Sequence, residues 1–126
     1  MQTKLPSKKE IKKLLHCILT TEDVKGVILV SFQGEIIFEE FLSPPPVDPH
    51  TKDWWGFFID SLKGIREADL LFEKSRLYIR RIEHGYLFVL MGVFAPIAML
   101  RLNCDTLLPN LKQMGKIKRF THLFAR

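Results

Sequence analysis

Residues 26–38 have the sequence GVILVSFQGEIIF, in which apolar runs lie on both sides of Gln33-Gly34. The first run, Val27–Val30, is a continuous series of β-branched and aliphatic residues, which is typical of a strand buried on both faces. A glycine in the second position favours a tight hairpin, so we expect a two-residue turn at Gln33-Gly34. The return strand is expected over Ile36–Phe41. The hairpin marks the start of a predicted β-sheet.

An amphipathic helix is expected before the hairpin, over Lys8–Thr20. Ser7 and Glu10 form a Ser-x-x-Glu capping box, which satisfies free backbone donors at a helix start. The apolar positions follow the i, i+3, i+4, i+7, i+8 pattern: Ile11, Leu14, Leu15, Ile18 and Leu19. A basic amphipathic helix also suits a membrane surface or a polyanion. The clean apolar stripe favours a helix packed on a sheet, with its lysines in solvent.

The composition suits one folded domain, residues 1–126. Of the 126 residues, 47% are hydrophobic, which is enough for a core. No apolar run approaches the ~20 residues of a membrane span, and no secretion signal follows the N-terminal lysines. Cys17 and Cys104 belong to no Cys-x-x-Cys motif. They are expected to be reduced core thiols of a cytoplasmic protein.

The net charge of +5 is unevenly distributed. Residues 1–21 carry +4, residues 22–73 carry −7, and residues 74–126, which include the basic tail 116–126, carry +8. An acidic middle between basic ends predicts separate positive and negative surfaces, which steer and orient partners.

Residues 43–52 contain four of the seven prolines, so neither a helix nor a central strand continues through them. The segment suits a polyproline ligand for a partner. A stiff connector is the more ordinary interpretation.

A second helix is expected after Asp53, a good N-cap residue. Apolar residues recur there at helical spacing: Trp54, Trp55, Phe58, Ile59, Leu62 and Ile65. With Leu70–Phe72 added, the apolar surface exceeds what a helix packed on one side needs. Tryptophans at a helix start are typical interface anchors, but the same residues also suit a helix that simply covers the sheet. The residues alone leave both interpretations open.

Further strands and a last helix are expected downstream. The strands are predicted over Arg76–Glu83, Tyr86–Phe94 and Ile97–Cys104, with a turn at His84-Gly85 and a helix over 105–114.

The sequence contains no recognisable catalytic constellation. Its glycines form no phosphate-binding loop, and its histidines lie in different predicted elements. His16 and Cys17 are neighbours on a helix and point to different faces, so they form no catalytic pair. Glu39 and Glu40 lie on opposite sides of a strand, and they indicate an edge strand with a wet side instead. We therefore expect no enzyme, no cofactor and no metal.

The chief alternative function is nucleic-acid binding. Arg76, Arg80 and Arg81 lie near Tyr78 and Tyr86, and interleaved basic and aromatic residues form single-strand platforms. The acidic middle and the absence of a nucleic-acid motif favour a solvated basic face instead.

The element order α-β-β-α-β-β-β-α resembles the Roadblock family of dynein-light-chain-like domains over Ile11–Met114. The match includes GVILVSFQGEIIF on the first hairpin and the closing stretch from Ile97 through Leu111. The resemblance implies an α+β fold with a five-stranded antiparallel sheet, the second helix on one face and the first and third on the other. It also implies a non-catalytic scaffold or regulator of small Ras-like GTPases or of motors.

The resemblance further implies a homodimer formed through the second helix and the third strand. Carried onto this chain, the interface residues are Trp54, Trp55, Phe58, Ile59 and Leu62, with Leu77, Tyr78 and Ile79 on an edge strand. The first and third helices would present a basic face to the partner: Lys8, Lys9, Lys12, Lys13, Lys112 and Lys116. The expected partners are thus a second copy and a small GTPase.

Overall fold

The computed structural model describes residues 8–44, 54–107 and 109. This part of the chain contains helices and strands in the predicted order α-β-β-α-β-β-β-α. They are α1 (Lys8–Leu19), β1 (Val24–Ser31), β2 (Ile36–Phe41), α2 (Trp54–Ser61), β3 (Glu67–Leu71), β4 (Arg76–Ile82), β5 (Gly85–Met91) and a helix over residues 97–107. The chain divides into two compact units. We call Thr21–Pro96 the sheet unit, and α1 with the helix over 97–107 the helical unit.

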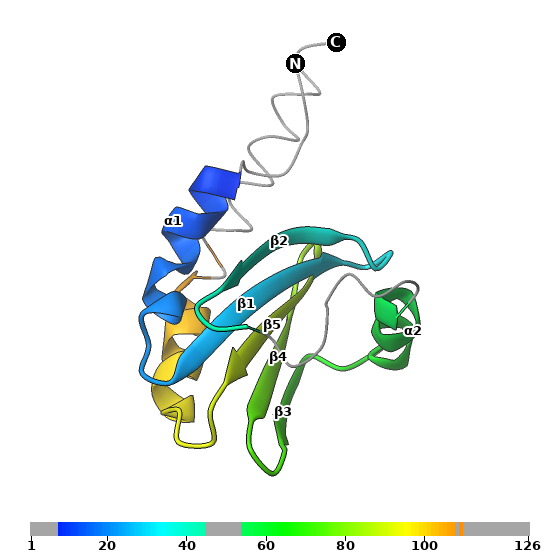
Figure 1. The fold of residues 1–126 in the computed structure, drawn as a ribbon. Coiled ribbons are helices and arrows are strands. Elements are labelled where there is room, and N and C mark those ends of the chain that lie inside the picture. The colour runs from blue at the N-terminus through cyan, green and yellow to red at the C-terminus, as the bar shows by residue number, and fades with distance from the viewer. Residues whose placement is uncertain (1–7, 45–53, 108, 110–126) are drawn as a thin grey trace. The chain divides into compact units, whose positions relative to one another are not determined.

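The five strands of the sheet unit form one antiparallel sheet in the order β2-β1-β5-β4-β3 (Figure 1). Residues Val27–Val30 of β1 are buried, as their continuous apolar run predicts. The prediction that Ile36–Phe41 is an edge strand is confirmed, because β2 pairs with β1 at one end of the sheet. The other end is β3.

The loop between β1 and β2 begins one residue earlier than predicted. The amide of Gly34 donates to the carbonyl of Ser31 (3.0 Å), and the amide of Ser31 donates to the carbonyl of Glu35 (2.8 Å). The loop therefore has three residues, Phe32 to Gly34, rather than two. Gly34 has φ 90°, the left-handed conformation that this loop requires at its last position.

One face of the sheet packs against α2. Ile59 and Leu62, from the end of α2 and the turn after it, lie in a buried cluster with side chains from three strands: Ile28, Val30, Ile79, Tyr86 and Phe88. Phe58 adds an aromatic contact to Phe88, with ring centroids 5.6 Å apart. This cluster fixes α2 to the sheet of its own protomer.

Two elements differ from the sequence prediction. Leu70 and Leu71, expected to add to the apolar surface of the second helix, belong to the strand β3 instead. Glutamate, alanine and leucine are good helix formers, and pairing of β3 with β4 overrides that local preference. Conversely, the predicted strand over Ile97–Cys104 is wrong, because residues 97–107 are helical.

The helix over residues 97–107 has a physical explanation in its sequence. Its buried residues, Leu100, Cys104 and Leu107, recur at helical spacing, and Pro96 lies just before its first turn. The last helix, expected over 105–114, therefore begins earlier, and Thr106 lies inside it, where its hydroxyl donates to the Leu102 carbonyl (3.0 Å).

The helical unit buries four of the five residues of the predicted stripe of α1, namely Ile11, Leu15, Ile18 and Leu19, and Leu14 is half-buried. The side-chain amide of Asn103 donates to the Cys17 carbonyl over 3.4 Å and joins the two helices of this unit. Neither Cys17 nor Cys104 forms a disulfide, but the expectation of two core thiols is wrong for Cys17, which is exposed. It lies beside the apolar stripe of α1 rather than on it. Ser7 and Asp53, the predicted capping residues, lie outside the described part of the chain.

Candidate docking surface

The edge strand β3 exposes large apolar side chains. Leu70 is 39% exposed, Leu71 is 65% exposed, and Phe72 in the following turn is 52% exposed. Ile65, which leads from α2 into β3, is also partly exposed. Exposed apolar side chains on an edge strand mark either an interaction surface or an aggregation site.

The backbone of β3 is oriented by its ladder with β4. The amide of Phe72 donates to the Ser75 carbonyl (2.8 Å), and the amide of Arg81 donates to the Arg66 carbonyl (2.9 Å). Ladder bonds of an antiparallel pair alternate along each strand. The backbone groups of Glu67, Asp69 and Leu71 are therefore directed away from β4, toward the edge of the sheet.

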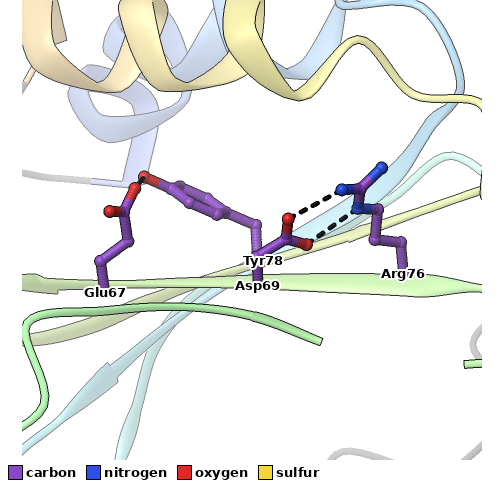
Figure 2. Close-up of polar contacts among 4 residues, drawn as sticks. All are labelled: Glu67, Asp69, Arg76 and Tyr78. Atoms are coloured by element: carbon purple, nitrogen blue, oxygen red, sulfur yellow. Dashed lines mark hydrogen bonds and ion pairs between the residues drawn. The ribbon is translucent and has the colours of Figure 1, made fainter. Parts of the chain in front are cut away.

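Polar side chains tie β3 to β4 (Figure 2). Ala68 packs against the cluster under α2, so the residues on either side of it, Glu67 and Asp69, project from the other face. Asp69 accepts two hydrogen bonds from Arg76, each 2.8 Å long. The Tyr78 hydroxyl donates a hydrogen bond to the carboxylate of Glu67.

A second arginine completes this arrangement. Arg80 donates to the Tyr78 hydroxyl over 2.9 Å. We call the set Glu67, Asp69, Arg76, Tyr78 and Arg80 the β3 clamp. Two carboxylates and two guanidinium groups make its formal charge zero. The hydrogen bonds that Arg76 donates to Asp69 raise the pKa of Arg76 above its ordinary value.

Most of the predicted interface residues lie in the core of the protomer. Ile59, Leu62, Tyr78 and Ile79 are buried inside one protomer, and Phe58 and Leu77 pack against the same core. The assignment of Leu77, Tyr78 and Ile79 to an edge strand is wrong, because β4 pairs with β5 on one side and β3 on the other. The third strand of the chain is β3. Its alternation of Glu67 and Asp69 with Ala68 and Leu70 is a short period-two pattern, which is a weak strand signal without β-branched or aromatic residues.

The tryptophans lie in the first turn of α2, where the structure describes the backbone alone. Their role at an interface stays a prediction.

The predicted basic face is partly within the described residues. Lys9, Lys12 and Lys13 of α1 are exposed, as their positions off the apolar stripe predict. Lys112 and Lys116 lie outside the described part of the chain, as does the side chain of Lys8.

The nucleic-acid platform suggested by interleaved arginines and tyrosines is not formed. Tyr78 and Tyr86 are both buried, so neither ring is available for stacking on a base. Arg76 and Arg80 are engaged in the β3 clamp.

The described residues contain no group of three or more His, Cys, Asp and Glu side chains that would hold a metal ion. None of their helices has the length and apolar character needed to cross a membrane.

No protein-family model matches the chain, and no curated protein matches it. Solved structures do match. An MglB with a tetrameric arrangement superposes with a TM-score of 0.71 at 15% identity, over 94% of this chain and 98% of that chain. The gliding protein MglB from Thermus thermophilus gives 0.72 at 14% identity, over 92% and 98%. A Roadblock/LC7 domain from Streptomyces avermitilis gives 0.56 at 15% identity, over 81% and 91%.

Proposed function

We propose that this chain, which has a Roadblock-like fold, forms a homodimer through β3 and α2 and serves as a non-catalytic docking protein for a small Ras-like GTPase. The observation that carries the proposal is the edge strand β3, with its outward-directed backbone and its exposed Leu70 and Leu71.

A second copy is the occupant that fits this edge. Two β3 strands related by a two-fold axis pair antiparallel, so that two five-stranded sheets become one. Such pairing covers the backbone groups of Glu67, Asp69 and Leu71 and buries the exposed leucines of both copies. A neighbouring MglB structure is described as a tetrameric arrangement, which is a property of that protein and is compatible with self-association here.

The helix α2 extends the same surface. Phe58, Ile59 and Leu62 are used within the protomer, which leaves Trp54 and Trp55 as the proposed anchors between copies. Aromatic anchors beside a strand pairing would make the interface larger and more apolar than the ladder alone.

The GTPase part of the proposal rests on the resemblance to the Roadblock family, whose members act as scaffolds and regulators of Ras-like GTPases. In this chain the exposed lysines Lys9, Lys12 and Lys13 supply a positive surface on α1. Charged surfaces of this kind select and orient a partner without catalytic groups.

The test uses the full-length chain. Light scattering over a range of concentrations is expected to give twice the chain mass of 14.7 kDa. Calorimetric titration with purified Ras-like GTPases of the source organism, loaded with GDP or a non-hydrolysable GTP analogue, is expected to show saturable binding to one of them. A monomer at every concentration would overturn the homodimer, and no binding to any GTPase would overturn the docking role. Tight, steeply salt-dependent binding of single-stranded RNA would favour nucleic acid instead.

A further inference from the structure

The edge strand β3 contains acidic residues that would oppose its pairing with a second β3. Glu67 and Asp69 supply two carboxylates within five residues of β3. Charges on an edge strand are a common protection against pairing with other strands, and like charges placed opposite each other destabilise a sheet.

Symmetry brings these carboxylates together. A two-fold axis perpendicular to the sheet leaves the side chain of each residue on the same face in both copies. Residues opposite each other in an antiparallel pair share a face, so odd-numbered residues of one β3 lie opposite odd-numbered residues of the other. Glu67 and Asp69 of both copies therefore lie on one face of the joined sheet. Every register that pairs at least three residues of β3 places Asp69 opposite Glu67, Asp69 or Leu71 of the second copy.

Acidic residues of the two copies would be close enough for their charges to affect pairing. Opposite residues of an antiparallel pair lie about 5 Å apart, and diagonal ones about 7–8 Å apart. With Asp69 opposite Asp69, the two Asp69 carboxylates face each other and each Glu67 is diagonal to one of them, so these charges would oppose dimer formation if they were not neutralised.

The β3 clamp removes this obstacle from within each protomer. Arg76 binds both oxygens of Asp69 at 2.8 Å. Glu67 bonds to the Tyr78 hydroxyl, which also accepts a hydrogen bond from Arg80 at 2.9 Å. The carboxylates are thereby drawn toward β4 and balanced by two guanidinium groups before a second copy arrives.

We propose that Arg76, with Tyr78 and Arg80, permits β3 to pair with a second β3 by neutralising Asp69 and Glu67, and so determines that this edge accepts its own copy. The inference rests on the proposed homodimer. Arg76 and Arg80 act here as specificity-determining residues, because they project from β4 and act through the acids of the edge strand.

The test measures the dimer dissociation constant by sedimentation equilibrium for the full chain and its variants. Arg76→Gln is expected to raise the constant about tenfold, because Asp69 then loses both hydrogen bonds and the positive charge of Arg76. Asp69→Asn in the Arg76→Gln background, and Arg76→Lys alone, are both expected to stay within about threefold of the parent. Lys74→Gln, which removes one positive charge from the exposed turn beside the clamp, is the charge-matched control and is also expected to stay near the parent.

The outcomes separate the possible failures. A monomeric parent chain would overturn the homodimer itself. A lower melting temperature in Arg76→Gln with an unchanged dissociation constant would show that the clamp only stabilises the protomer. An equal loss in Lys74→Gln, or no recovery in the double variant, would also overturn the inference. Arg80→Gln, which leaves the Arg76 contacts in place, is also expected to raise the dissociation constant. This variant replaces Arg76→Gln as the test if Arg76→Gln does not fold. An unchanged constant in that variant would count against the clamp.

Discussion

The hydroxyl of Tyr86 donates a hydrogen bond to the backbone carbonyl of Leu62 over 3.1 Å, and it joins the central strand β5 to the segment that leaves α2. Tyr86 is buried, and the ring of Phe32 packs edge-on against it with centroids 5.6 Å apart. The same carbonyl accepts the amide of Ile65 at 2.8 Å, in the turn that leads into β3. The bond therefore helps to fix where the edge strand begins.

Tyr86→Phe is expected to lower the free energy of unfolding by about 1 kcal/mol. The loss is at the low end for a buried hydrogen bond because the Leu62 carbonyl keeps its bond from Ile65. Urea denaturation at fixed protein concentration measures the change. No loss of stability would mean that the hydroxyl contributes nothing to holding this turn.

Gly85 is a second position where the structure allows little change. A Cβ at Gly85 would lie 1.9 Å from the Val30 carbonyl oxygen and 2.8 Å from the Cα of Ser31. Both contacts are with backbone, which cannot rotate away as a side chain does. Gly85→Ala is therefore expected to destabilise the sheet by about 1–3 kcal/mol, measured as a lower urea midpoint with an unchanged slope. A midpoint equal to that of the parent would show that β1 and β5 are farther apart at this end.

The lysines of α1 offer a test of partner docking. Replacing Lys9, Lys12 and Lys13 by Glu is expected to weaken binding of the GTPase at least about tenfold, because the positive surface becomes negative. The melting temperature should change little, since these side chains are exposed. A control with Lys63 and Lys74, exposed lysines of the sheet unit, replaced by Glu should retain binding. A lower melting temperature with intact GTPase binding would contradict the assignment.

Much of the fold could be predicted from the sequence, because the strongest patterns are local. Val27–Val30 is apolar at every position, and burial of this strand follows. The apolar stripe of α1 has a spacing that fits a helix and does not fit a strand. The same local logic failed at residues 97–107, where an apolar alternation of a few residues fits both a strand and a helix. The helix is distinguished by its longer-range spacing of Leu100, Cys104 and Leu107.

The candidate docking surface was harder to predict, because its edge is a property of the whole sheet. The prediction that Leu77, Tyr78 and Ile79 form an edge strand treats β4 as the third strand, because Glu67–Leu71 is not predicted to be a strand. Glu67–Leu71 lacks the β-branched and aromatic residues that mark strands, and its pairing with β4 depends on contacts such as Asp69 to Arg76. These contacts appear only when the two strands are side by side.

The claim that two copies meet at β3 is tested most directly by two exposed leucines near opposite ends of the sheet. Leu71 is 65% exposed on β3, and Leu42 is 57% exposed directly after β2. Each is replaced by Glu, and the molar mass is measured by light scattering across a common concentration range. The account predicts that Leu71→Glu gives the 14.7 kDa protomer while Leu42→Glu keeps the dimer mass of the parent. A dimer that survives Leu71→Glu, or that is lost equally in Leu42→Glu, would contradict it.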